Sequence, residues 1–415
     1  MTERHRLKFR ESRPGEAASL ARSGSRSFRS ATPELWQSYF EAREVSPPDT
    51  LVVEVDGVTA GHATMIPLTM SLAGRDVPMR GVAAVAVLPE FRRRGVADAL
   101  MRECLKRMRR RGEALSLLYA FRMSFYRKFG YGVSEWADHV RVAPAQLPAS
   151  PLRRRVRVLD RVRDQREVRR VYEASRGGRT GPLKRSAEWW EMRVFKRAPD
   201  GGVYVNPATR RMEGYLLYDV PVDPPYPRQQ LLVRELVAVT PEAFRGLLGF
   251  LEAQGDQFKL IEIAMPRGQA VGLLTDFGLV GVTEALRLFQ TTGLASGGAM
   301  TRLVDVTKAL ALHPAPAKNG ARGKIGLDLE DPVFPAQSRG FDVSFGARGA
   351  RALPGRSARD RLALPVASLA GVYMAGSSAR TLLAQGFATG SRRAAELLDE
   401  AFAGPPTFLY PLNGF

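Results

Sequence analysis

Hydrophobic positions in the first third of the chain follow a strand-like order that a helical period interrupts once. Four short apolar or β-rich runs favour strands: residues 51–55, 61–66, 82–88 and 115–119. Between the last two runs, apolar side chains recur three and four residues apart from Ala97 to Met108, which predicts an amphipathic helix that Gly112 ends. The order strand, helix, strand is typical of an α/β sheet with a crossover helix.

The same order returns in the middle of the chain. Strands are predicted at residues 214–218, 231–239 and 258–264, and a helix at 241–252 lies between the last two. The residues from Ala86 to Arg92 also resemble those from Ala238 to Arg245, because in both an apolar run leads into Pro-Glu and a helix start. This weak repeat predicts a duplicated domain whose second copy lacks the arginine cluster of the first.

The last third of the chain changes character. A segment rich in Pro, Ala, Lys and Gly, His313–Lys324, breaks the pattern, and residues 364–415 are predicted to be mostly helical. The chain ends in the largely apolar residues Phe408–Phe415. Because a disordered tail is usually polar, we expect this end to pack against the rest of the protein.

Composition is that of an ordinary globular protein. The 415 residues are 45% hydrophobic and 25% charged, which suits two to four domains of roughly 100–200 residues each. The longest apolar run is far shorter than the roughly 18 residues of a membrane span, and the N-terminus lacks the apolar stretch of a signal peptide. The single cysteine, Cys104, lies on the apolar helix face and has no disulfide partner. We therefore expect a cytoplasmic protein without membrane contact.

The formal net charge of +20 sets 62 Lys and Arg against 42 Asp and Glu, and such an excess attracts anions. Nucleic acid is a disfavoured partner, because the arginine runs are not interleaved with aromatic residues and no known binding motif is present. Runs such as Arg109–Arg111 and Arg153–Arg155 are interpreted as solvated surface. The four histidines show no metal-ligand spacing, so no metal is assigned.

The segment with the most specific chemistry is Arg92–Ala97, which follows a predicted strand and opens the amphipathic helix. A helix N-terminus offers unpaired backbone N–H groups and the positive end of the helix dipole, and therefore binds phosphate. Gly95 allows the backbone to approach an anion, and the arginines add charge-assisted donors. Neither the P-loop Gly-Lys-Ser/Thr nor the dinucleotide pattern GxGxxG is present.

Arg92-x-x-Gly95-x-Ala97 resembles the (Gln/Arg)-x-x-Gly-x-(Gly/Ala) motif with which GNAT acetyltransferases hold the pyrophosphate of acetyl-CoA. Phe-Tyr-Arg-Lys-Phe-Gly-Tyr-Gly at 125–132 is similar to a frequent GNAT ending. Together with its length and apolar terminus, the chain resembles the Eis-like (enhanced intracellular survival) branch of that superfamily. The resemblance implies an α/β (α+β) protein of three parts: an active GNAT domain at 1–148, a degenerate GNAT-like domain at 149–295, and a sterol-carrier-protein-like domain at 296–415 whose terminus enters the active site.

The resemblance also implies residue roles in an acetyl-CoA-dependent N-acetyltransferase. The pantetheine arm and phosphates would contact Val85, Ala86, Val87, Arg92, Arg93, Arg94, Gly95, Val96, Ala97, Asp98, Phe121 and Arg122. Tyr126 would act as general acid toward the CoA thiolate, and the C-terminal carboxylate of Phe415 would act as base through water. Trp36 would line the acceptor pocket. From the residues alone, Tyr126 and Trp36 could instead be packing residues, and Phe415 an apolar plug.

The acceptor is expected to be an amine, either a small molecule or a lysine. A polycationic acceptor is disfavoured, because the segment Arg22–Arg29 is basic and Asn413-Gly414 precedes the terminus where an acidic lining would be expected. The competing interpretation is a GNAT fold that binds acyl-CoA as a sensor without catalysis. The resemblance further implies a homo-oligomer, such as a hexamer.

Overall fold

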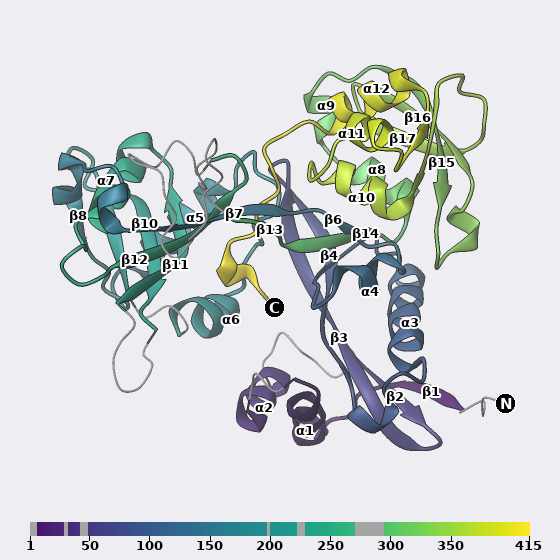
Figure 1. Ribbon diagram of the computed structural model, residues 1–415, viewed down its shortest axis with the longest axis horizontal. Helices are drawn as coiled ribbons and strands as arrows, with labels where there is room; N and C mark the ends of the chain where they lie inside the picture. Colours follow the sequence, from purple (N-terminus) through teal and green to yellow (C-terminus); the bar gives the residue numbers. More distant parts are fainter. Residues whose placement is uncertain (1–5, 29–31, 42–48, 197–199, 222–228, 270–293) are drawn as a thin grey trace, which may run out of the picture.

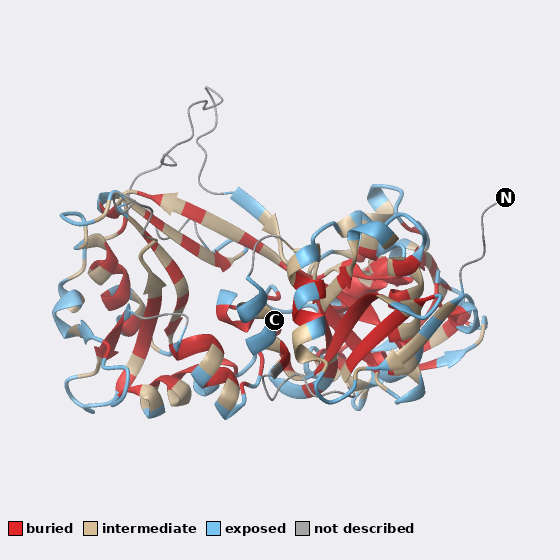
Figure 2. Cartoon of the chain, turned by 90° about the horizontal axis from the view of Figure 1, so that it is seen from below, coloured by how far each residue is buried: buried red, intermediate tan, exposed pale blue. Residues whose placement is uncertain are grey.

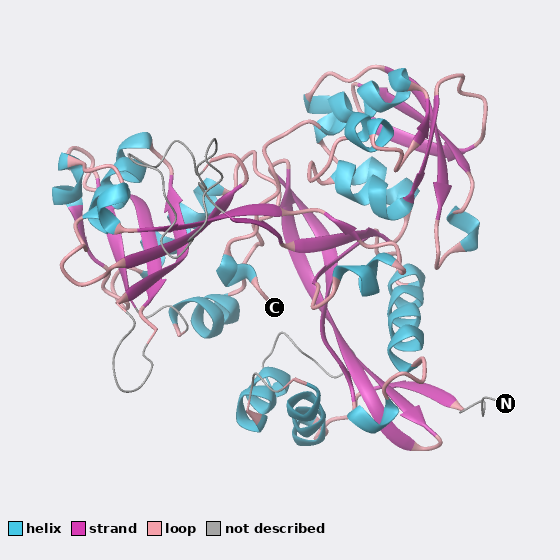
Figure 3. Ribbon diagram, viewed as in Figure 1, coloured by secondary structure: helices cyan, strands magenta, loops and turns pink. Residues whose placement is uncertain are grey.

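The computed structural model describes residues 6–28, 32–41, 49–196, 200–221, 229–269 and 294–415, and these form three mixed sheets with helices on their faces (Figure 1). Figure 3 shows helices and strands interspersed in all three parts of the molecule. The predicted α/β class is therefore confirmed. No helix in the described ranges is long and apolar enough to cross a bilayer.

The first sheet has the strand order β1-β2-β3-β4-β5-β14-β6. Its strands are β1 (Leu7–Glu11), β2 (Thr50–Val55), β3 (Val58–Leu72), β4 (Arg75–Val87), β5 (Leu115–Tyr119), β6 (Gly132–Val133) and β14 (Ala299–Leu303). The helices around it are α1 (Ala17–Ser27), α2 (Pro33–Glu41), α3 (Val96–Arg110) and α4 (Met123–Arg127). The predicted amphipathic helix is confirmed as α3, whose stripe is completely buried at Leu100, Met101, Cys104, Leu105 and Met108.

The second sheet has the order β13-β7-β12-β11-β10-β9-β8. Its strands are β7 (Trp136–Val142), β8 (Val156–Val158), β9 (Asp200–Val205), β10 (Met212–Asp219), β11 (Gln230–Ala238), β12 (Leu260–Pro266) and β13 (Leu294–Gly297). The helices are α5 (Gln165–Ser175), α6 (Ala187–Trp189) and α7 (Pro241–Glu252), with a π-helical turn at Trp190–Phe195. The three strands and the helix predicted in this region are thereby confirmed.

The third sheet has the order β17-β16-β15-β18-β19. Its strands are β15 (Gly323–Glu330), β16 (Gly340–Gly346), β17 (Gly349–Pro354), β18 (Arg361–Pro365) and β19 (Thr389–Gly390). The helices are α8 (Val306–Leu312), α9 (Ala315–Lys318), α10 (Val366–Tyr373), α11 (Ala379–Ala384) and α12 (Arg392–Phe402). The prediction of mostly helix after residue 364 holds as far as Phe402 and is wrong beyond it, where the chain is irregular except for one short turn at Pro411–Asn413.

Strands are exchanged between the sheets across the expected domain boundaries. β7 precedes residue 148, yet it pairs with β12 in the second sheet. β14 follows residue 296, yet it pairs with β5 and β6 in the first sheet. The boundaries 1–148, 149–295 and 296–415 remain a prediction for the sequence segments, whereas each of the first two sheets is built from more than one of them.

The C-terminal segment leaves the third part of the molecule and ends between the other two (Figure 1). Its residues Phe408, Leu409, Tyr410 and Leu412 are buried in one apolar cluster that includes side chains of all three parts. Figure 2 shows buried positions along strands on both sides of the C-terminus. The packing expected for the apolar terminus is thus confirmed.

Candidate active site

The edges of β4 and β5 separate in the middle of the first sheet. The two strands run parallel and pair only at Arg80–Ser116 and Gly81–Leu117. Beyond that point β4 pairs with β3 and β5 pairs with β14, so a gap opens between them. A bulge in the β3–β4 pairing lies at the same level, with Ala84 at φ 49°. A bulge bends and twists its strand, so β4 leaves one edge of backbone groups available to an extended ligand.

The N-terminus of α3 lies just after this part of β4. Gly95 precedes the helix in the left-handed conformation (φ 77°), and within the described chain no side chain caps the first turn. A Cβ added at Gly95 would meet no atom within 4 Å, so the space beside this residue is open. Arg93 and Arg94 are exposed beside it. This geometry fits a phosphate, because the dipole and the unpaired donors point to one place.

Two residues of the predicted phosphate segment have other contacts. The Arg92 guanidinium donates to the Val87 carbonyl (3.2 Å) and to the Ser27 carbonyl (3.3 Å), and so ties the loop to β4 and α1. The Asp98 carboxylate pairs with Arg102 (2.7 Å) and Lys128 (3.1 Å). Burial acts to raise the pKa of Asp98, but the hydrogen bonds from these two cations lower it below its usual value. The carboxylate is thereby neutralised beside the open loop.

Tyr126 lies on α4, with 4% of its surface exposed. Its ring meets Phe125 at 5.0 Å and the largely exposed Phe121 at 5.6 Å between centroids. Arg122, also exposed, precedes the helix. Burial raises the pKa of Tyr126 to about 12, so its hydroxyl stays protonated at neutral pH. Burial would also raise the pKa of a thiol in the same place. Proton transfer from the Tyr126 hydroxyl to a thiolate there is therefore feasible.

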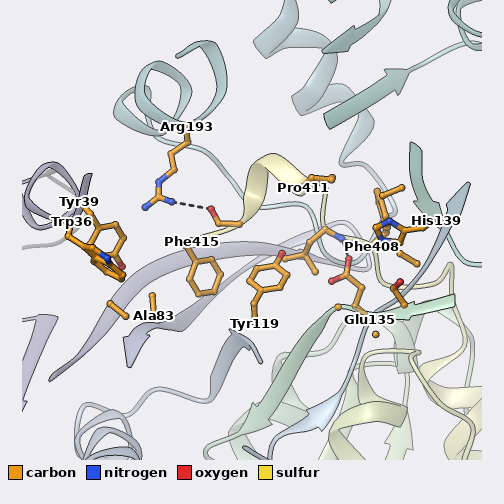
Figure 4. Close-up of a pocket in the computed structure, with 18 residues that line it drawn as sticks. Trp36, Tyr39, Ala83, Tyr119, Glu135, His139, Arg193, Phe408, Pro411 and Phe415 are labelled. Carbon is orange, nitrogen blue, oxygen red and sulfur yellow. Dashed lines mark hydrogen bonds between the residues drawn. The ribbon is translucent and has the colours of Figure 1, made fainter. Parts of the chain in front are cut away.

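A cavity of about 630 Å³ lies on the other face of the sheet (Figure 4). Its walls are mainly aromatic and small side chains, including Trp36, Tyr39, Ala83, Tyr119, Phe408 and Phe415. Leu117 and Leu118 of β5 mark the two faces, because Leu117 packs in the cluster that Phe415 contacts and Leu118 packs in that of Tyr126. Phe415 and Tyr126 therefore pack on opposite faces of β5.

Phe415 is seated beside the point where the two strands separate. Its ring lies 5.6 Å from that of Tyr119. A Cβ added at Gly81 would stand 2.8 Å from the Phe415 ring, so glycine makes room for it at the last paired position of β4. Trp36 lines the same cavity and stacks on Phe40 at 5.9 Å.

The last residues of the tail are held by the second sheet and its helices. Trp189 donates to the Leu412 carbonyl (3.1 Å), and Arg193 donates to the Gly414 carbonyl (3.2 Å). The Asn413 side-chain oxygen accepts from Arg185 (2.8 Å) and from the Tyr172 hydroxyl (3.2 Å). The position of Phe415 is thus fixed by backbone and side-chain bonds on three successive residues.

Glu135 also lines the cavity, and sequence reasoning missed it. It lies between β6 and β7 and is only 3% exposed. Its two carboxylate oxygens accept from the backbone N–H groups of Ala299 (2.8 Å) and Leu409 (2.5 Å). Burial raises the pKa of Glu135 to about 7. The one signal in the sequence is an acid three residues after the Phe-Gly-Tyr-Gly motif, and nothing in a pattern of neighbours predicts contact with a residue 274 positions away.

In the part of the chain that the structure describes, no three His, Cys, Asp or Glu side chains group as a metal site requires. His62 and His313 are buried, and burial lowers the pKa of each, to about 4 and about 3. Cys104 is buried as well, and burial raises the pKa of its thiol to about 12. These groups lie outside the cavity lining.

Three families match successive parts of the chain. The acetyltransferase (GNAT) domain matches residues 8–134, a second acetyltransferase (GNAT) domain matches 181–288, and the sterol carrier protein domain matches 306–410. The chain is an N-acetyltransferase of the GNAT family. The two GNAT matches fall on the first two sheets and the third match on the last sheet, as the resemblance implied.

Relatives and solved structures have the same architecture as this GNAT protein. The N-acetyltransferase Eis of Mycobacterium tuberculosis is 28% identical over 377 residues, which cover 87% of this chain and 88% of that one. A GCN5-related N-acetyltransferase from Anabaena variabilis superimposes with a TM-score of 0.81 at 18% identity, over 98% of this chain and 99% of the other. Eis1 from Mycobacterium abscessus gives a TM-score of 0.76 at 23% identity, over 99% and 100%. At these identities the structures support the fold.

Proposed function

We propose that the first GNAT domain transfers an acetyl group from acetyl-CoA to an amine by direct attack, with no acyl-enzyme intermediate. The observation that supports this is that Tyr126 and the chain terminus pack against opposite faces of β5, which borders the β4–β5 gap. A GNAT fold supplies the family chemistry, in which the thioester of an acyl-CoA provides the activated acyl group.

The residues around the gap fit such a co-substrate. The backbone of Val85–Val87 would run along the pantetheine arm, and the open first turn of α3, with Arg93 and Arg94, would hold the phosphates. Phe121 and Arg122 follow the end of β5 and are exposed, and both would border the pantetheine. The Arg92 side chain would act indirectly, because its guanidinium is bound to the Val87 and Ser27 carbonyls.

Two groups would move protons. The Tyr126 hydroxyl, protonated at neutral pH, would donate to the departing thiolate. The Phe415 carboxylate, held by the bonds to its preceding residues, would accept a proton from the attacking nitrogen through water. Trp36 would form part of the wall that receives the body of the amine.

The test is release of free thiol from acetyl-CoA in the presence of an amine panel: aminoglycosides, lysine peptides, arylamines and neutral amino sugars. Tyr126→Phe keeps the ring and removes only the hydroxyl, so kcat should fall by about 10²–10⁴-fold, while calorimetric affinity for acetyl-CoA stays within about twofold. Thiol release by the variant at the wild-type rate would refute the role of Tyr126. Binding without thiol release by the wild type would indicate an acyl-CoA-binding module instead. A cytoplasmic location and a homo-oligomer remain predictions.

A further inference from the structure

Glu135 is a buried acid with no counter-ion among the residues that the structure describes. Within the described residues its carboxylate contacts two backbone N–H groups and forms no ion pair. In a chain with a net charge of +20 this is unusual. A buried carboxylate that is only hydrogen-bonded to neutral donors is costly to ionise, and such groups concentrate at functional sites.

The other buried carboxylates of the described chain show the contrast. Each of them is paired with an arginine: Asp164 with Arg157 (2.6 Å), Glu235 with Arg185 (2.8 Å) and Asp331 with Arg302 (2.6 Å). None of these six residues lines the cavity, whereas Glu135 does. The position at which the counter-ion of Glu135 would stand is therefore on the cavity side.

The rest of the cavity limits what that counter-ion can be. Most of the lining is aromatic or small and apolar. The cavity already contains one cation, Arg193, whose guanidinium donates to the Gly414 carbonyl and lies over the Tyr39 ring at 5.5 Å. In Figure 4 Arg193 and Glu135 lie on opposite sides of Phe415 and Tyr119. One carboxylate opposed by one fixed guanidinium suits a ligand with a single positive charge.

We propose that Glu135 binds the protonated amino group of the acceptor and takes its first proton, and that the acceptor is a monoamine carried on an aromatic or other apolar body. This rests on the proposed acetyl transfer at the same site. It departs from the polycationic acceptors that an acidic pocket would select, because a second ammonium group would meet Arg193.

The protons balance as follows. The acceptor enters as an ammonium and loses one proton to Glu135. The neutral nitrogen forms a bond to the acetyl carbonyl carbon, and the bond from that carbon to sulfur breaks. The nitrogen loses its second proton to the Phe415 carboxylate, and Tyr126 gives one proton to sulfur. Phe415 returns its proton to Tyr126 through solvent, and Glu135 releases one proton to solvent, so an ammonium and an acetyl thioester yield an amide, a thiol and one proton.

The groups that face Glu135 determine its titration. Tyr119, on β5, lies near enough that the charge of Glu135 helps raise its pKa, after burial as the main cause. The N–H groups on β14 and on the tail favour the ionised form of Glu135, against burial, which disfavours it. His139 on β7, Arg193 and Phe415 line the same cavity. With a pKa of about 7, Glu135 is a stronger base than an ordinary carboxylate and is half ionised near neutral pH.

The test is calorimetry of the full-length protein with 2-phenylethylamine, its uncharged isostere 2-phenylethanol, and spermidine. Wild type should bind the monoamine most tightly. Glu135→Gln should lower the affinity for the monoamine by at least about tenfold and should keep the affinity for the alcohol within about twofold of wild type. The same chemical change at the exposed Glu242 is the matched control and should change neither. Equal loss for amine and alcohol, unchanged affinities in Glu135→Gln, or a wild-type preference for spermidine would each overturn the proposal.

A second readout separates binding from tail placement. Because Glu135 also accepts from Leu409, Glu135→Gln could loosen the tail, so the rate at which carboxypeptidase releases Phe415 should be compared between variant and wild type. With the tail seated, kcat/KM of wild type should fall as pH drops below about 7, and Glu135→Gln should lack this step while His139→Gln keeps it. Persistence of the step in Glu135→Gln would refute the proton-accepting role. Amine binding that depends on Glu135 without any thiol release would refute only the acetyl transfer.

Discussion

The junction between β4 and α3 in the first GNAT domain resembles in sequence the junction between β11 and α7 in the second. The two helices nevertheless begin differently. In the first, β4 ends at Val87, a 3₁₀ turn covers Pro89–Phe91, and α3 begins only at Val96 after the arginine loop. In the second, β11 ends at Ala238 and α7 begins at Pro241. The Pro-Glu pair that forms the turn in the first domain is thus part of the helix in the second.

The caps differ accordingly. Gly95 leaves the first turn of α3 open, whereas the Thr240 hydroxyl accepts from the Ala243 N–H (3.3 Å) at the start of α7. A capped helix has one backbone donor fewer to offer a phosphate. The start of α7, with a shorter loop and a capping hydroxyl, is therefore less suited to a phosphate than the start of α3.

The regions beyond the parallel pairing differ as well. β11 pairs with β12 only as far as Val233. Just past it, Glu235 forms the ion pair with Arg185 and accepts from the Tyr215 hydroxyl (2.6 Å). Arg185 in turn donates to Asn413 of the tail. Where the first domain keeps an open gap, the second holds a buried ionic network that fixes the terminus.

Breaking that network should have the largest effect. Arg185→Met leaves the Glu235 carboxylate buried without a partner, which costs about 3–5 kcal/mol of unfolding free energy. Urea denaturation measures this. Replacing both residues, with Arg185→Met and Glu235→Leu together, should recover part of the loss, because no charge is then left unpaired. If the double variant is no more stable than the single one, the pair does not act as a unit.

Glu135 and Glu235 form the second contrast. Both acids are buried, but among the described residues only Glu235 has an ion-pair partner. Because the pKa of Glu135 is raised from 4.5 to about 7, the folded state holds its proton more tightly than the unfolded state. Its contribution to stability is complete below pH 4.5 and is lost as pH rises to about 7, by about 3 kcal/mol. Glu135→Gln cannot titrate, so its unfolding free energy relative to wild type should improve by about that amount from pH 5 to pH 8. An equal difference at both pH values would contradict the raised pKa.

The tail that the second domain holds can be displaced directly. Deleting Phe415 moves the carboxylate by up to about 3.5 Å, and a misplacement of that order should lower kcat by about 100-fold. The loss should shrink at high pH, where hydroxide can take the proton of the attacking nitrogen in place of the carboxylate. Acetyl-CoA affinity should stay within about twofold, since the tail lies on the face opposite Tyr126. Full activity at neutral pH in a protein with residues appended after Phe415 would exclude the carboxylate as base.

The smallest effect expected is at the two helix starts. Gly95→Asp should weaken acetyl-CoA by at least about tenfold, or about 1.4 kcal/mol, because a carboxylate would occupy the open space before α3. Thr240→Ala, the matched change at α7, should cost about 1 kcal/mol of stability and leave acetyl-CoA affinity unchanged. Calorimetry and denaturation of both variants test the comparison. A loss of acetyl-CoA affinity in Thr240→Ala would mean that the second domain also binds the co-substrate.

Local pattern predicted the parts of the molecule that local chemistry determines. The stripe from Ala97 to Met108 and the glycine before it were enough to predict α3 and its exposed N-terminus, because period and capping depend on near neighbours. The location of β14 in the first sheet, and the contact of Glu135 with Leu409, could not be predicted in this way. Both depend on pairing between residues far apart in the chain, for which the alternation of one strand carries no information.

Because strands are exchanged between the sheets, the first sheet can be completed only late in the synthesis of the chain. β14 stands between β5 and β6, so the first sheet lacks an inner strand until residues 299–303 have been made. A nascent chain that has emerged only through β6 would expose the edges of β5 and β6, which are prone to pair with other strands. The first GNAT domain is thus encoded first but completed late. A fragment cut at its apparent boundary would lack β14, an inner strand of its own sheet.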